Sequence, residues 1–154
     1  MTEACLLLLQ HGAVIDAPTG RPHKTTLHIA VAGGHLDLLK ILVKKYKADW
    51  RVTDDWGWTA LHEAAVRGHT DIIRFLMKEC RDLVNQKDKL GRTPLLLGLL
   101  SGIDEVVTSK ANWSIFTKDF DQKAARVLLE LGESPSNEDL VGRGCLEAAV
   151  LYSR

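Results

Sequence analysis

Two histidines are the residues of this sequence whose type and spacing could support metal or acid–base chemistry. His62 is followed by Glu63, which is how the His-Glu-x-x-His zinc motif of metalloproteases begins. That motif needs a second histidine four residues later on the same helix face, and this position is Val66. The zinc-protease interpretation is therefore excluded.

A metal ion shared by His28 and His62, which are 34 positions apart, is also disfavoured. Leu96 and Glu147 occupy the matching positions of two later segments, and a shared metal site would not tolerate these replacements. No phosphate loop follows Gly33, because the Gly-Lys-Ser/Thr pattern is missing. We predict no catalytic residue, no cofactor and no metal.

The composition narrows the class of partner. Among 154 residues, 20 are lysine or arginine and 20 are aspartate or glutamate, so the formal net charge is zero. Nucleic acid is disfavoured because phosphate binding needs a cationic surplus, and no apolar run is long enough to span a membrane. The three cysteines, Cys5, Cys80 and Cys145, are odd in number and far apart. They are typical of reduced thiols in an intracellular protein, cytoplasmic or nuclear.

The elements that would position these side chains are clearest in residues 59–77. Thr59 is placed to cap a short helix through its side-chain oxygen, and Leu61 and Ala64 fall on one face of it. Gly68 stands where a helix ends in a left-handed residue, and residues 71–77 begin a second apolar-faced helix. The short connection predicts that the two helices pack antiparallel.

The same pattern recurs when the sequence is shifted by 34 residues. Residues 25–35 and 93–102 repeat the threonine, leucine and glycine positions of 59–69. The chain resembles the ankyrin repeat family, which has a repeat of about 33 residues and a Thr-Pro-Leu-His-x-Ala pattern. The resemblance implies an all-α solenoid of hairpin–helix–helix repeats, and a role in binding other proteins. It also implies that His28 and His62 each fix their own hairpin by hydrogen bonding near a helix start, in place of metal or acid–base chemistry.

The spacing divides the chain into one array. We predict a half repeat at 1–19, repeats at 20–53 and 54–87, a longer repeat at 88–138, and a half repeat at 139–154. Gly57 and Gly91 are 34 positions apart but Gly91 and Gly142 are 51 apart, which places an insertion at about 103–120. Lys47 replaces the glycine that normally closes the second helix, so this helix end is expected to be capped differently.

The half repeats suggest a piece of a longer protein whose ends are uncovered. Leu6, Leu7 and Leu8 at one end, and Leu146, Ala149 and Val150 at the other, would stack on neighbouring repeats in the family. Left in water, such apolar surface favours association, so the chain is expected to associate end to end, or to be less stable than the same segment within a longer protein.

The tryptophans are the first candidates for partner contact. Trp50, Trp56 and Trp58 lie close together in sequence, and the resemblance places Trp56 and Trp58 at projecting hairpin positions. Tryptophan and arginine dominate binding hot spots, so we add Arg92 and, in the insertion, Trp113. The alternative is that these rings fold down on neighbouring hairpins.

The second candidate surface is the concave helix face. The resemblance lines it with residues of three successive first helices: Ile29, Ala32, Gly33, Glu63, Val66, Arg67, Leu97, Leu100 and Ser101. A partner peptide or helix could lie there, although an ordinary solvated face is an equal alternative. We therefore predict a non-catalytic protein-interaction module. The alternatives are a structural spacer within a larger scaffold, kinase or channel, and an enzyme whose site is built by the insertion.

Overall fold

The computed structural model describes residues 2–20 and 22–100, and ten further positions: 127, 130, 131, 134, 136, 138–140, 142 and 144. Within these residues the ordered elements are helical, and no strand occurs. The elements are α1 (Thr2–Gln10), α2 (Thr26–Ala32), α3 (Leu36–Lys44), α4 (Ala60–Val66), α5 (Thr70–Glu79), the 3-10 turn η1 (Arg81–Leu83) and α6 (Pro94–Leu100). The predicted all-α fold class is confirmed for these residues.

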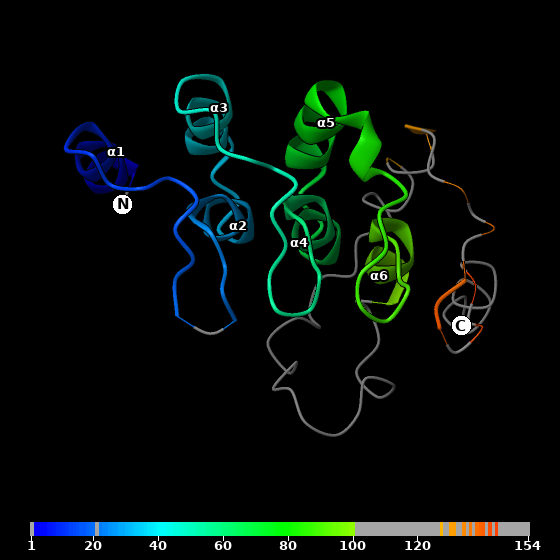
Figure 1. Ribbon diagram of the computed structural model, residues 1–154. Helices are drawn as coiled ribbons and strands as arrows, with labels where there is room; N and C mark the ends of the chain where they lie inside the picture. Colours follow the sequence, from blue (N-terminus) through cyan, green and yellow to red (C-terminus); the bar gives the residue numbers. More distant parts are fainter. Residues whose placement is uncertain are drawn as a thin grey trace.

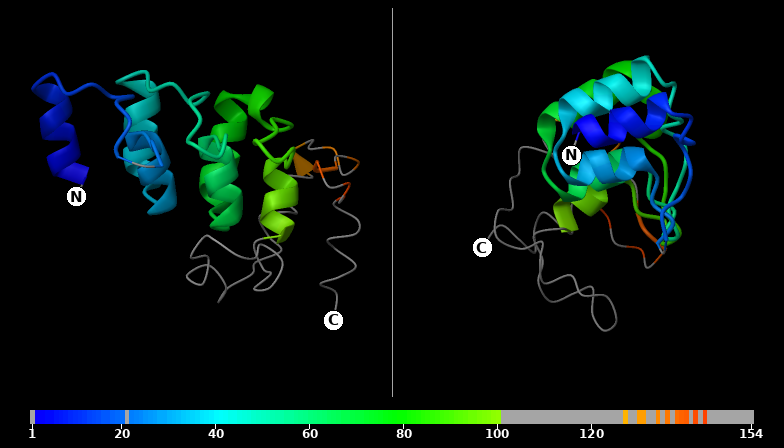
Figure 2. Two further views of the ribbon diagram at one scale, coloured as in Figure 1. Left: turned by 60° about the horizontal axis from the view of Figure 1, so that its bottom comes forward. Right: turned by 90° about the vertical axis from the view of Figure 1, so that its left-hand side faces the viewer.

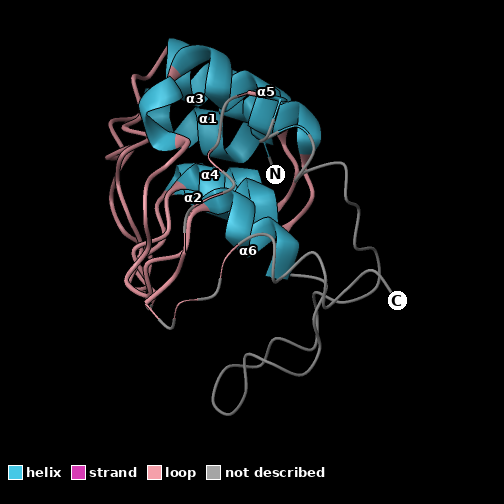
Figure 3. Ribbon diagram, turned by 90° about the vertical axis from the view of Figure 1, so that its right-hand side faces the viewer, coloured by secondary structure: helices cyan, strands magenta, loops and turns pink. Residues whose placement is uncertain are grey.

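The helices stand in two rows (Figure 1). We call α1, α3 and α5 the outer row, and α2, α4 and α6 the inner row. Figure 2 shows the helices following one another along the array, with α1 at one end. The loops that lead into α2, α4 and α6 all project to the same side, as the end-on view in Figure 3 shows. Each outer helix thus precedes a long hairpin that projects beside the inner row.

The outer helices are held by apolar stripes with helical spacing. In α5, Ile72, Ile73, Leu76 and Met77 are buried, the half-buried Phe75 packs at the edge of the same core, and Asp71, Arg74 and Lys78 are exposed. The sequence predicts this stripe, and α3 repeats it. The stripes of α3 and α5 join the inner helices in one continuous core. Its largest fully buried side chains include Leu27, Leu39, Leu42, Leu61, Leu95 and Leu96.

Helix α4 is the centre of the array, because every one of its residues is buried. It packs between α2 and α6, and it is lined with small side chains such as Ala64 and Ala65. On α6, a Cβ at Gly98 would lie 3.4 Å from the carbonyl oxygen of Ala65. The glycine therefore allows α6 to approach α4 closely.

The ends of the helices confirm two predictions and overturn one. Gly68 ends α4 with a φ of +70°, and Pro94 begins α6. The expectation that α3 ends differently at Lys47 is wrong. Lys47 adopts a φ of +57°, and the N–H of Ala48 donates to the carbonyl of Leu42 at 3.0 Å, which is the usual left-handed helix end. A lysine in this conformation costs about 1 kcal/mol more than glycine.

Several predictions fall outside the described residues. These are the insertion at about 103–120, Trp113, Ser101, the side chain of Leu100, and nearly all of the half repeat at 139–154. The repeat boundaries stay predictions. At the other end, Leu7 and Leu8 of α1 are more than half exposed. None of the described helices combines the length and the apolar character needed to cross a membrane.

Candidate protein-binding surface

The hairpin before α4 is organised by a buried aspartate. Oδ1 of Asp54 accepts the backbone N–H groups of Trp56 and Trp58 at 2.9 and 3.0 Å. Gly57 has a φ of +80°, and a Cβ there would lie 3.0 Å from the backbone nitrogen of Lys89. The turn therefore needs glycine for two reasons, its left-handed backbone and the close approach of the next hairpin.

Neighbouring hairpin tips are joined by backbone hydrogen bonds, which makes them one continuous surface. The N–H of Asp55 donates to Pro22 O at 3.1 Å, and the N–H of Lys89 donates to Trp56 O at 3.0 Å. A ring nitrogen of His23, which has a φ of +56°, also lies 2.7 Å from Oδ1 of Asp55. We call this surface the tip ridge and define it by Pro22, His23, Asp55, Trp56, Lys89 and Leu90.

Trp56 is the large aromatic residue of the tip ridge. Its side chain is 41% exposed, as expected for a projecting hairpin position. The ring packs at a tilt of 50° against Trp58, with centroids 5.9 Å apart, and the amine of Lys24 lies 5.8 Å from its centroid. The indole is thus supported by Trp58 and Lys24, while about two fifths of the residue stays open to solvent.

Trp58 does not project, and the prediction that it would is wrong. It is 2% exposed, and its indole N–H donates to Oδ2 of Asp88 at 3.1 Å. Its ring joins Val66 and Leu97 in a small second core. The cause is the buried carboxylate of the next hairpin, which offers an acceptor that draws the indole inward.

Arg92 is also buried, so it is not an exposed anchor as the sequence suggested. Its Nε and Nη2 lie 2.8 and 2.7 Å from Oδ2 of Asp88, and the two side chains are at most 5% exposed. Oδ1 of Asp88 meanwhile accepts the backbone N–H groups of Leu90 and Arg92. Arg92 therefore compensates a buried charge inside the array.

The inner helix face is less open than predicted. Glu63 is almost fully buried, with Lys24 Nζ 2.6 Å and Arg67 Nε 3.1 Å from its carboxylate oxygens. Val66 and Leu97 are 7% and 4% exposed. The prediction of an accessible surface is thus wrong for Glu63, Val66 and Leu97, because Lys24 covers the carboxylate and α6 packs closely on α4.

Four of the predicted inner-face residues remain at least partly accessible. Ile29 is 42% exposed, the side chain of Arg67 is 30% exposed, Gly33 is exposed and Ala32 is half-buried. Lys24 is the residue that the sequence reasoning missed. It lies 34 positions before Trp58, which lies 34 before Arg92. That shared offset marks the residue that faces the neighbouring hairpin, and it could have identified Lys24.

His28 and His62 tie each inner helix to the following hairpin. Nδ1 of His28 accepts from the N–H and hydroxyl of Thr25 at 3.3 and 2.9 Å, and Nε2 donates to Trp58 O at 2.9 Å. His62 makes the same contacts with Thr59, at 3.1 and 2.9 Å, and with Arg92 O, at 3.3 Å. The prediction that each histidine fixes its own hairpin near a helix start is confirmed for the contacts with Thr25 and Thr59. The sequence did not predict that Nε2 of each histidine binds the hairpin of the next repeat.

Burial keeps both imidazoles neutral. It lowers the pKa of His28, and it lowers the pKa of His62 to about 4. Both ring nitrogens of each histidine are occupied by hydrogen bonds, so neither is available to a ligand. Within the described part of the chain, no group of three His, Cys, Asp or Glu side chains could hold a metal ion.

Trp50 lies apart from the tip ridge. It is half-buried, packs against the main core, and lines a pocket between the ends of α3 and α5. The structure thus brings Trp56 and Trp58 together and separates Trp50 from them.

A sequence model of ankyrin repeats, in three copies, matches residues 27–109, which is more than half of the chain. No curated protein matches the chain significantly. The match begins at Leu27, one residue before His28, and it includes both histidines and the hairpins that they bind, at Trp58 and Arg92. The chain therefore belongs to the ankyrin repeat family.

Proposed function

We propose that the array binds a protein partner along its tip ridge, with Trp56 as the main anchor. Ankyrin repeats generally serve as protein–protein interaction modules, and the family is typically non-enzymatic. We place this interaction inside the cell, in the cytoplasm or nucleus. In support, the buried thiol of Cys80 is unpaired and donates to Leu76 O at 2.9 Å.

The observation that carries the proposal is the half-open indole of Trp56. A tryptophan side chain buries up to about 250 Å² in an interface. Two fifths of this area is about 100 Å², and covering it would contribute about 2.5 kcal/mol at 25 cal/mol/Å². The ring is already held by Trp58 and Lys24, so little side-chain entropy is lost when a partner covers it.

The test has two stages. A peptide library displayed on phage is selected against the array, and the dissociation constants of the selected ligands are measured by calorimetry for wild type and for Trp56→Ala. We expect at least a 30-fold weaker affinity, which corresponds to about 2 kcal/mol. Leu8→Ala is the matched control, since it removes an apolar side chain that is 62% exposed on α1, away from the ridge.

Ligands that bind Trp56→Ala as tightly as the wild type would contradict the proposal. An equal loss in Leu8→Ala would show that general hydrophobic contact, and not the tip ridge, provides the affinity. Melting curves of each variant show whether the fold is retained.

A structural spacer is the second candidate function. It is favoured by the burial of Trp58, Glu63 and Arg92, whose polar groups are paired within the array. A spacer would show no selectable ligand whose binding depends on Trp56. The enzyme alternative has no observation in its favour among the described residues.

A further inference from the structure

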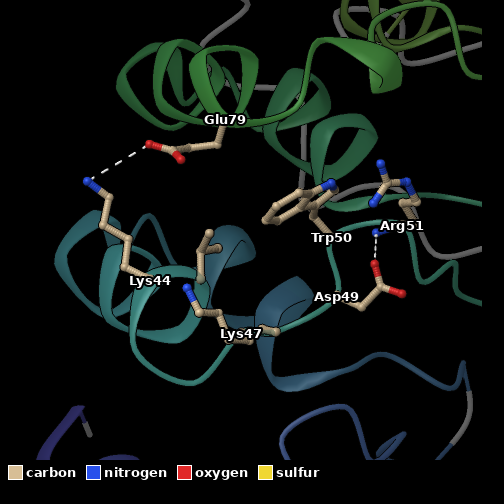
Figure 4. Close-up of a pocket in the computed structure, with 8 residues that line it drawn as sticks. Lys44, Lys47, Asp49, Trp50, Arg51 and Glu79 are labelled. Carbon is tan, nitrogen blue, oxygen red and sulfur yellow. Dashed lines mark hydrogen bonds and ion pairs between the residues drawn. The ribbon is translucent and has the colours of Figure 1, made fainter.

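The outer row carries a pocket that the tip ridge does not include. It has a volume of about 380 Å³ and lies between the C-terminal ends of α3 and α5. Its lining residues are Val43, Lys44, Lys47, Ala48, Asp49, Trp50, Arg51 and Glu79. Figure 4 shows Lys44, Lys47, Trp50 and Glu79 around the same space. We call it the outer pocket, and its volume is within the range of ligand sites.

One side of the outer pocket is apolar. Val43 and Ala48 belong to the main core, and the half-buried ring of Trp50 packs against that core. The guanidinium carbon of Arg51 lies 5.7 Å from the centroid of Trp50. In the described part of the structure, the buried indole N–H of Trp50 has no hydrogen-bond acceptor. The ring thus offers a firm apolar wall to a ligand side chain.

The lining of the outer pocket carries three cations, Lys44, Lys47 and Arg51, against two carboxylates, Asp49 and Glu79. The guanidinium of Arg51 is already paired with a carboxylate, since its Nη2 and Nε lie 2.8 and 3.1 Å from Oδ2 of Asp82. Lys44 Nζ is 3.9 Å from Glu79 Oε1, too far for a hydrogen bond. The amine of Lys47 makes no ion pair or hydrogen bond with any described residue. Lys44 Nζ also lies 5.8 Å from the ring centroid of Phe75, and Oδ1 of Asp49 accepts the backbone N–H of Arg51 at 2.9 Å. The amine of Lys47, and the loosely paired amine of Lys44, can therefore contact an anion at the edge of the pocket.

Lys47 reaches this position through an unfavourable backbone conformation. Its φ is +57°, whereas the matching end of α1 has Gly12 with a φ of +90°. Glycine would adopt this left-handed conformation at a helix end without steric strain. The chain carries instead a cation that lines the pocket, at a conformational cost that the fold itself does not require.

We propose that the outer pocket binds an acidic peptide segment, with a carboxylate between Lys44 and Lys47 and a neighbouring apolar side chain against Trp50. The segment would belong to a protein partner. The carboxylate would complete the charge balance that Glu79 leaves open at 3.9 Å, and the apolar side chain would cover the exposed part of the indole. This site is distant in the fold from the tip ridge, so it does not depend on the function proposed above.

The probe is the peptide acetyl-Asp-Leu-Asp-amide, compared with acetyl-Asn-Leu-Asn-amide, which has the same shape without the charge. Binding is followed through the indole N–H signal of Trp50 in two-dimensional NMR spectra, assigned with Trp50→Phe. We expect the acidic peptide to shift this signal with saturation, and the amide peptide to shift it at least five-fold less at equal concentration. The Trp56 and Trp58 signals should stay in place.

Three variants locate the contact. Lys47→Gly should weaken binding at least five-fold while leaving the melting temperature equal or higher, since glycine suits the backbone at this position. Lys45→Gln removes the same charge from the exposed neighbour that does not line the pocket, and should change affinity less than two-fold. Glu79→Gln should tighten binding about three-fold, because it removes the competing carboxylate.

The proposal is overturned if the two peptides shift the Trp50 signal equally, or if Lys47→Gly binds the acidic peptide as well as Lys45→Gln does. Inorganic phosphate is the last arm of the experiment. If phosphate moves the signal with an affinity equal to that of the acidic peptide, the pocket is a general anion site and the peptide assignment is wrong.

Discussion

Acidification should destabilise the array through His62. This imidazole is neutral and buried, its pKa is lowered to about 4, and both of its nitrogens are engaged, by Thr59 and by the carbonyl of Arg92. In the unfolded chain the pKa returns to about 6.5. The unfolded state therefore binds more protons between these two values, and stability falls as the pH falls from about 6.5 to about 4.

The size of the loss follows from the same interval. Each unit of difference in pKa corresponds to 1.36 kcal/mol, so complete titration of His62 would remove about 3 kcal/mol. The burial-lowered pKa of His28 acts in the same direction. Asp54 acts in the opposite direction, because burial raises the pKa of its carboxyl and its stabilising contribution is lost as the pH rises.

The measurement must therefore isolate His62 from these other groups. Urea unfolding is followed by circular dichroism between pH 7 and pH 4.5, for wild type and for His62→Gln. Glutamine is accepted at this position of a capping box but leaves the carbonyl of Arg92 without its donor. The variant should be about 1–3 kcal/mol less stable at pH 7, and the two curves should converge as the pH falls.

The matched control is His11→Gln, at an exposed position just after α1, which should follow the wild-type pH dependence. A His62→Gln curve that stays parallel to the wild type over the whole range would refute the reasoning. In that case His62 is not the group whose protonation opposes folding.

Three further predictions concern core packing and self-association. Trp58→Ala should lower the free energy of unfolding by about 3–5 kcal/mol in urea titrations, because it empties the small second core and removes a donor from Asp88, whereas Trp56→Ala should cost less than about 1 kcal/mol. Equal losses in the two variants would show that the difference in burial is not decisive. Leu61→Ala in the fully buried α4 should cost about 2–5 kcal/mol by the same method, and a loss below about 1 kcal/mol would contradict its place between the repeats. Leu8→Glu should reduce the end-to-end self-association that we expect from the exposed face of α1, and light scattering over a concentration series that gives identical masses for variant and wild type would exclude that end as the contact.

Much of the fold could be predicted because its signals are local. Thr59, Gly68 and Pro94 each have a conformational preference that acts within a few residues, and the apolar stripe of α5 shows its period directly in the sequence. The 34-residue offset then extends each local prediction to the next repeat. These are the features that the structure confirms.

The candidate site was predicted less well, because exposure depends on contacts between repeats. Trp56 and Trp58 flank the same glycine, yet one is open and the other buried. The difference comes from Asp88, which is 30 positions after Trp58 and accepts its indole N–H. Glu63 is likewise hidden by Lys24, which is 39 positions before it. No local pattern in the sequence identifies such partners. The shared 34-residue offset of Lys24, Trp58 and Arg92 does identify them.

That offset also explains why two successive interfaces between hairpins, the one at Asp54 and the one at Asp88, are unequal. Oδ2 of Asp88 is shared by Trp58 and Arg92, whereas Oδ2 of Asp54 is buried without a hydrogen-bond partner among the described residues. At the position that corresponds to Trp58, the preceding repeat has Lys24, whose amine is drawn to Glu63 at 2.6 Å. The lysine can support Trp56 from that position, but it leaves Asp54 incompletely satisfied. Lysine at position 24 therefore supports the ring of Trp56 on the tip ridge, and it also makes the interface between hairpins at Asp54 weaker than the one at Asp88.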